Sequence, residues 1–164
     1  MYPRNHLDRP GHAAAIMAGS GECLSYGELE ARANRGAHLL RDRGLTRGDA
    51  VALMIENRPE FFTAYWAAQR AGLFITPIST RLTPDEAAYI VNDSAAKALL
   101  LSAGVGVTAE RLVAERDALI PDVDTVFGLS GLAGVPDWEE SCAEWPETPI
   151  ADESPGFHMV YSSG

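Results

Sequence analysis

The segment Phe157–Gly164 places two hydroxyl groups and a glycine directly after a short apolar run. The run Phe157–Tyr161 predicts a buried strand, and Ser162, Ser163 and Gly164 predict the start of the loop that follows it. Glycine tolerates positive φ, so backbone N–H groups and serine hydroxyls in such a loop can converge on an anion. We therefore take Ser162, Ser163 and Gly164 as candidate phosphate-binding residues. The alternative is an ordinary turn at the end of a strand.

A second glycine motif, Gly104–Ala109, matches the G-x-G-x-x-A pattern of dinucleotide-binding folds. That pattern requires an acidic residue at the end of the next strand, where it holds the ribose. Here Asp122 and Asp124 precede the next apolar run, Thr125–Leu129, and no acid follows that run until Asp137. We interpret the motif as a tight turn between a strand and a helix.

Other residues that could take part in catalysis or bind a metal do not have the spacing that such sites require. Ser94 and Lys97 match S-x-x-K, but Lys97 enters a predicted strand, where the two side chains would point to opposite faces. The four histidines show no i, i+4 pairing, so no metal site is predicted. No catalytic residue is assigned in this chain. His158 is interpreted as packed in the sheet, with a place near substrate as the alternative. Four aromatic residues are interpreted as core packing of one helix: Phe61, Phe62, Tyr65 and Trp66.

Short apolar runs alternate with amphipathic stretches, and this predicts an α/β fold with a mostly parallel sheet and helices on both faces. The expected strands are Val51–Ile55, Phe74–Ile78, Ala98–Leu101, Thr125–Leu129 and Phe157–Tyr161.

Start and stop signals place the helices. Ser25 with Glu28 forms a capping box for a helix over about 26–43, which Gly44 ends. Pro59 begins a second helix that closes at Gly72. Thr83, Pro84 and Glu86 begin a third, near 85–92.

Residues 128–156 are rich in glycine, proline and acid, which predicts a long surface excursion with one short helix near 137–143. Trp138 and Trp145 are expected to hold this excursion against the body. We expect residues 1–164 to form one α/β lobe.

Composition limits the classes of partner. Thirteen basic and 23 acidic residues give a net charge of -10, which argues against nucleic acid or an anionic membrane as the main partner. No apolar run is long enough to span a bilayer. Cys23 and Cys142 have no metal spacing around them and are expected to be reduced thiols. We expect a cytoplasmic protein.

The order of several segments resembles the acyl-CoA synthetase branch of the adenylate-forming (AMP-binding) ligases. The segments that carry this resemblance are Asp8–Pro10, Ala13–Met17, Leu24–Leu29, Gly48–Ala52, Glu56–Phe61, Ala68–Gly72 with Pro77, Leu82–Ser94 and Tyr161–Gly164. The resemblance implies that Tyr161–Gly164 opens the family's phosphate loop, whose later threonines, glycine and lysine are absent here. It therefore implies an N-terminal fragment of the large domain.

The same resemblance implies the activity of the parent enzyme. A carboxylic or fatty acid would react with ATP and Mg²⁺ to give an acyl-adenylate and pyrophosphate, and the acyl group would then pass to coenzyme A. The fragment alone is expected to be inactive and to self-associate through exposed surface of the lobe. Two alternatives remain open: a non-catalytic flavodoxin-like or Rossmann-like nucleotide-binding module, and part of an amino-acid-activating adenylation domain.

Overall fold

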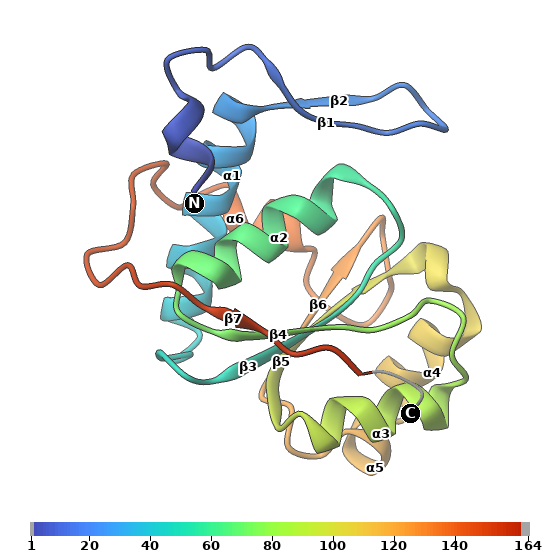
Figure 1. Ribbon diagram of the computed structural model, residues 1–164. Helices are drawn as coiled ribbons and strands as arrows, with labels where there is room; N and C mark the ends of the chain where they lie inside the picture. The colour runs from blue at the N-terminus through green and yellow to red at the C-terminus, as the bar shows by residue number, and fades with distance from the viewer. Residues whose placement is uncertain (1, 162–164) are drawn as a thin grey trace.

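A computed structural model describes residues 2–161 and contains a five-stranded parallel sheet with helices on both faces (Figure 1). The strand order is β6-β5-β3-β4-β7. The strands are β3 (Ala50–Met54), β4 (Phe74–Pro77), β5 (Ala96–Ser102), β6 (Thr125–Leu129) and β7 (Phe157–His158). One face carries α1 (Tyr26–Asp42), α2 (Pro59–Arg70) and α6 (Trp138–Cys142), and the other carries α3 (Pro84–Asp93), α4 (Val107–Ala114) and α5 (Arg116–Leu119). The predicted fold class is confirmed.

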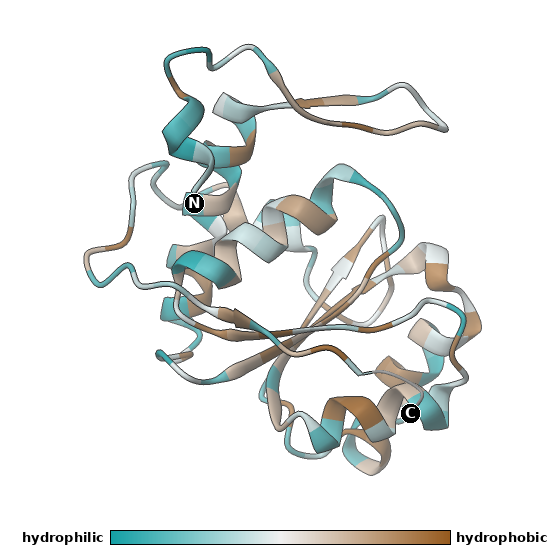
Figure 2. Ribbon diagram, in the orientation of Figure 1, coloured by the Kyte–Doolittle hydropathy of each residue, from teal (hydrophilic) through white to brown (hydrophobic). Residues whose placement is uncertain are grey.

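The central strand β3 shows why the expected strands lack polar alternation. Val51 and Leu53 pack against the α1 and α2 layer, while Ala52 and Met54 pack against α3 and α4. Both faces of the strand are therefore buried, and every position is apolar. Figure 2 shows the same continuous apolar colouring along the middle of the sheet.

The predicted helix signals act as expected. The Ser25 hydroxyl accepts from the Glu28 backbone N–H, and the Glu28 carboxylate accepts from the Ser25 N–H, so the capping box of α1 is complete. Thr83 and Glu86 form the same arrangement at α3. The chain leaves α1 through Gly44 at φ +84, a conformation that glycine adopts without strain.

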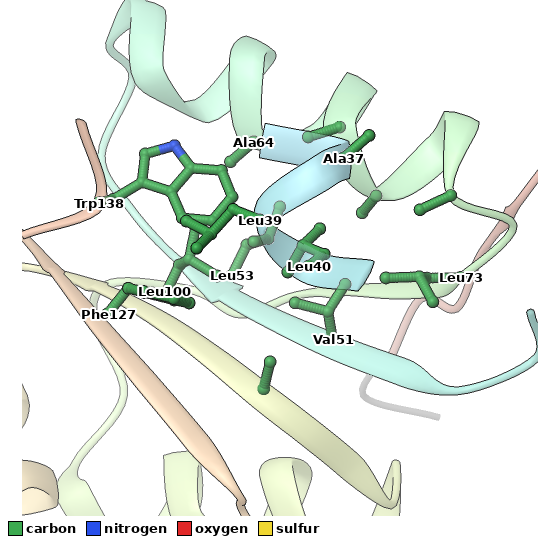
Figure 3. Packing of buried hydrophobic residues seen from close by; sticks show 14 of the residues in the cluster. Ala37, Leu39, Leu40, Val51, Leu53, Ala64, Leu73, Leu100, Phe127 and Trp138 are labelled. Carbon is green, nitrogen blue, oxygen red and sulfur yellow. The ribbon is translucent and has the colours of Figure 1, made fainter. Parts of the chain in front are cut away.

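The predicted excursion passes over the α1 and α2 layer and is held there by aromatic and polar contacts. Trp138 is 2% exposed, and its ring lies 5.3 Å from that of Phe127 at 74° (Figure 3). Trp145 packs at the edge of the same cluster, so both predicted tryptophan anchors are confirmed. The side chains of Asn34 and His38 also bind the backbone oxygens of residues 147 and 148, at 2.5 and 2.9 Å.

A buried cluster of charged side chains holds the end of this excursion against α1 and α2. Arg70 is 0% exposed, and its guanidinium donates to the two carboxylate oxygens of Glu30 at 3.0 and 2.7 Å and to Asn34 Oδ1. Glu153 completes the cluster at 3.5 Å from Arg70 and also binds Arg4. Burial raises the pKa of Glu30, but the hydrogen bonds and charge of Arg70 outweigh it and hold that pKa below the ordinary value.

The expectation of a buried strand at Phe157–Tyr161 is wrong. Strand β7 covers only Phe157–His158 and pairs with β4 alone, at Phe74↔Phe157 and Ile75↔His158. Phe157 is 68% exposed and Val160 70% exposed, because no other described strand lies on the outer side of β7. His158 is exposed as well, so its interpretation as a packed histidine also fails.

An element that we did not predict precedes α1. Strands β1 (Ala13–Ile16) and β2 (Cys23–Ser25) form an antiparallel hairpin, which extends beyond the helices after the 3₁₀ turn η1 (Pro3–His6) (Figure 1). The glycine-rich turn and the short apolar run were the available signals. No helix among the described residues is long and apolar enough to cross a membrane.

Candidate functional site

The candidate site lies at the carboxyl edge of the sheet. Because all five strands are parallel, the segments that follow them emerge at one edge, and ligands of open α/β sheets bind outside that edge. The segments that emerge there include Glu56–Arg58 after β3, Ser79–Arg81 after β4, Ala103–Gly104 after β5, Ser130 after β6 and Met159–Tyr161 after β7.

One cleft of this edge, which we call the tyrosine cleft, has a volume of about 730 Å³. It lies between α3 and the segment after β7, and Tyr89, Ile90 and Tyr161 supply much of its wall. Asp85 and Glu86 add acidic side chains from the first turn of α3. The cleft therefore suits an apolar or neutral group better than a polyphosphate.

Tyr161 is fixed in direction by a contact with α3. Its hydroxyl donates to Asp93 Oδ2 at 2.6 Å, and this hydrogen bond is the main cause that raises the pKa of Tyr161 to about 12. Tyr161 directly precedes Ser162, Ser163 and Gly164 in the chain. These three predicted phosphate ligands lie outside the described residues, so their role stays a prediction. The tyrosine cleft lies beside Tyr161, the residue that precedes them.

A second cleft, here called the polar cleft, has a volume of about 500 Å³ and lies at the ends of β3 and β4. Hydroxyl, amide, guanidinium and carboxylate groups line it, from Glu56, Asn57, Ser79, Thr80 and Arg81. Glu56 Oε2 is buried and has no hydrogen-bond partner among the described residues, which leaves it available to a donor. The cleft can thus bind a group with both anionic and hydrogen-donating parts.

The sequence motifs did not predict the polar cleft. The signal that could have found it is the position of polar residues immediately after predicted parallel strands. Arg58 at the same edge is already engaged: it donates to Ser130 Oγ at 2.5 Å and to Glu60 Oε2 at 2.6 Å. It therefore fastens the segments after β3 and β6 to each other.

The dinucleotide-like motif at Gly104 and the S-x-x-K match at Ser94 and Lys97 are both explained by local packing and hydrogen bonds. Gly104 packs against Glu56, since a Cβ at this position would lie 1.6 Å from Glu56 Oε1, and this contact explains the glycine without a dinucleotide. Ser94 Oγ donates to the Val91 carbonyl, while Lys97 Nζ contacts Asp49 Oδ1 at 2.7 Å. Over residues 2–161 no group of three or more His, Cys, Asp or Glu side chains is placed to hold a metal ion.

The four aromatic residues of α2 divide into two pairs. Phe61 and Tyr65 pack against the core, as predicted. Phe62 and Trp66 are half-buried and line a cavity beneath the N-terminal hairpin, so the packing interpretation holds for only part of the group.

Comparison with known proteins gives a consistent result. The family model described as AMP-binding enzyme matches residues 4–164. Surfactin synthase subunit 1 of Bacillus subtilis (strain 168) is 31% identical over 161 residues, which is 98% of this chain and 4% of that protein. The 3-hydroxybenzoate–CoA ligase of Aromatoleum sp. (strain CIB) is 30% identical over 152 residues, which is 90% of this chain and 28% of that protein.

The fold is shared with solved structures. A Mycobacterium tuberculosis fatty acyl CoA synthetase superposes with a TM-score of 0.81 at 27% identity, covering 98% of this chain and 32% of that structure. The chain therefore spans less than a third of each of these three proteins.

Proposed function

Because this chain belongs to the AMP-binding enzyme family, we propose that it forms part of an acyl-CoA synthetase, which activates a carboxylic or fatty acid with ATP and passes the acyl group to coenzyme A. The observation that carries this proposal is the match of the family model through Ser162, Ser163 and Gly164. These residues follow the parallel strand β7 after the three residues Met159–Tyr161, at the carboxyl edge of the sheet. The similarity to a CoA ligase along 90% of the chain supports the choice of acceptor.

The chemical problem in such a reaction is negative charge. A carboxylate must approach the α-phosphate while charge builds up on the departing pyrophosphate, so the site needs donors that are already in position. We propose that the hydroxyls of Ser162 and Ser163 and the N–H of Gly164 begin this set of donors. The Tyr161–Asp93 hydrogen bond would set the direction in which the loop leaves β7.

The described residues suit a role in orienting substrate. We propose that the polar cleft, with the Arg81 guanidinium and the hydroxyls of Ser79 and Thr80, receives a charged part of one substrate. Magnesium would neutralise charge on the phosphates of ATP. No group of three or more ligating side chains over residues 2–161 fits a resident ion, so we assign it no protein site here.

A second candidate function has its own observation. The match to a surfactin synthase subunit covers 98% of the chain, and the name of that protein does not specify coenzyme A as the acceptor. An adenylation domain that activates an amino acid would share the phosphate loop and differ in the acid and in the acceptor.

The test is a titration of the isotopically labelled chain with ATP or pyrophosphate, followed by NMR. We expect saturable shifts at the amides of Tyr161–Gly164 in the millimolar range, and their loss in the double variant Ser162→Ala, Ser163→Ala. The variant Ser94→Ala is the matched control. Shifts centred on Gly104–Ala109 would instead support a dinucleotide turn. Absence of any shift at Tyr161–Gly164 would refute the phosphate assignment.

Catalysis is tested separately. The relatives contain more than three times the length of chain present here, so we propose that the 164 residues alone do not catalyse ATP–pyrophosphate exchange. Exchange above a buffer blank, with benzoate or a fatty acid as substrate, would refute this. We also propose a cytoplasmic location, which agrees with free thiols at Cys23 and Cys142.

The outer edge of β7 supports a proposal of self-association. Phe157 and Val160 expose most of their apolar surface beside backbone groups that no described strand pairs. Light scattering should show mass rising with concentration, and Val160→Lys should suppress the rise. A constant monomer mass in the parent chain would count against the proposal.

A further inference from the structure

A cavity of about 340 Å³ lies beneath the N-terminal hairpin, on the outer side of the α1 and α2 layer. We call it the aromatic chamber. Its walls come from η1, β1, α1 and α2, and they are mostly apolar. The rings that line it belong to Tyr2, Tyr26, Phe62 and Trp66. Among the described residues, the chamber shares no lining residue with the tyrosine cleft or the polar cleft.

Small side chains keep the chamber open. Ala14 and Ala15 of β1 line it, and a larger apolar residue there would take up part of the space. Tyr2 and Trp66 approach each other to 6.1 Å between ring centres, at a tilt of 56°, and do not stack face to face. Ligand pockets range upward from roughly 300 Å³, so the chamber has room for one ring with a few additional atoms.

A polar vestibule of about 170 Å³ adjoins the chamber. His6 and Tyr26 line both spaces, and their rings stack at 4.5 Å along the side where the two spaces meet. Asp8, Arg9 and His12 supply the rest of the vestibule. A ligand with an apolar body and a polar head could therefore place one end in each space.

The vestibule favours an acceptor as the head group. Arg9 offers a guanidinium and each imidazole can donate one N–H, whereas Asp8 is the only carboxylate among its described lining residues and lies 3.7 Å from Arg9. The first N–H groups of α1 add nothing, because those of Tyr26 and Gly27 already donate to the carbonyls of residues 12 and 10. Side chains alone would thus hold the head group.

We propose that the aromatic chamber and its vestibule bind a small aromatic carboxylate, with the ring against Trp66 and Phe62 and the carboxylate facing Arg9 and the two histidines. This site is separate from the carboxyl edge of the sheet and does not depend on adenylation. It is testable in the absence of ATP.

The experiment uses 4-fluorobenzoate with the full chain, observed by ¹⁹F NMR, and benzoate in a labelled sample. We expect saturable broadening, together with contacts from the ring protons of benzoate to the Trp66 indole. Ala15→Leu fills the chamber and should weaken binding at least tenfold. Ala13→Leu, an exposed position on the same strand, should leave binding unchanged.

Matched probes test the head group. Benzamide and benzylamine have the same ring with a neutral or a cationic head, and both should bind several-fold more weakly than benzoate. Arg9→Gln should reduce the preference for benzoate, whereas the exposed control Arg47→Gln should not. Equal or tighter binding of benzylamine would overturn the carboxylate assignment. Absence of saturable binding by all three probes, or binding that Ala15→Leu leaves intact, would overturn the site.

Discussion

Tyr161 and Asp93 are joined by a hydrogen bond of 2.6 Å, which connects the segment after β7 to the last residue of α3. The bond spans the two walls of the tyrosine cleft at the point where the predicted phosphate loop begins. It requires a protonated phenol and a carboxylate that accepts.

The first prediction concerns this bond. Asp93→Asn removes the charged acceptor, so the pKa of Tyr161 should fall from about 12 toward its ordinary value of 10.0. The ¹³Cζ shift of Tyr161, followed against pH, measures it. Asp85→Asn alters the same cleft without touching the bond and should leave the titration unchanged. An unshifted titration in Asp93→Asn would contradict the assignment.

The same contact has a consequence for stability at high pH. Because the pKa in the folded state is the higher one, the contribution of the bond is fully present below pH 10 and is lost as pH rises from 10 to about 12. Unfolding by urea at several pH values should show this decline, and Tyr161→Phe should flatten it.

The second prediction concerns the buried cluster around Arg70. Arg70→Met leaves the Glu30 carboxylate buried and unpaired, so the free energy of unfolding should fall by about 3 to 5 kcal/mol. Urea denaturation measures the loss, with the exposed Arg47→Met as control. The double variant Arg70→Met, Glu30→Met should recover part of the loss. A single variant as stable as the parent would show that the cluster contributes nothing.

Acid should weaken the same cluster. The folded-state pKa of Glu30 is lower than its ordinary 4.5, so its stabilisation is present above pH 4.5 and is lost as pH falls through the lower, folded value. Melting temperature should decline across that range. Glu30→Gln should be less stable at neutral pH and show a shallower decline. A parallel decline in both proteins would assign acid sensitivity to other carboxylates.

The third prediction tests the close packing of α1 on α2. A Cβ at Gly36 would lie 2.7 Å from both Ala67 Cβ and Trp138 Cζ2. Alanine gains about 1 kcal/mol in helix propensity, but overpacking against atoms that cannot rotate away costs about 1 to 3 kcal/mol. Gly36→Ala should therefore lower stability in thermal denaturation. Gly19→Ala, with no atom within 4 Å, should have little effect.

The fourth prediction separates the two thiols. Cys23 is exposed, whereas Cys142 is buried and burial raises its pKa. Ellman's reagent should modify Cys23 rapidly in the native chain and reach Cys142 only on unfolding. Peptide mapping identifies the modified residue. Equal rates for both thiols in the native state would contradict the described packing of α6.

Local signals predicted much of the fold because they act over a few residues. The capping boxes at Ser25 and Thr83, and the apolar runs of β3 and β6, needed no knowledge of distant contacts. The burial of the Arg70 guanidinium could not be predicted from the sequence, because its partner Glu30 lies 40 residues away. The exposure of β7 was also hidden, since an apolar run does not reveal whether neighbours cover both of its sides.

The candidate site was predictable only in part. The Ser-Ser-Gly sequence predicts a phosphate loop, which stays a prediction because it lies outside the described residues. The polar cleft could not be predicted from local patterns, because it depends on β3 and β4 ending side by side. The aromatic chamber depends on a hairpin whose position over α2 no local pattern specifies.

The residues just before β7 are hydrogen-bonded to the C-terminal end of α2. Ser154 N–H donates to the Arg70 carbonyl at 3.0 Å and Gly156 N–H to the Gln69 carbonyl at 2.7 Å, while the Arg70 side chain holds Glu153. The α1–α2 pair must therefore assemble before this segment can settle. In a refolding chain, β7 would dock among the last elements, so the point at which the proposed phosphate loop begins would be positioned only after the helical layer had folded.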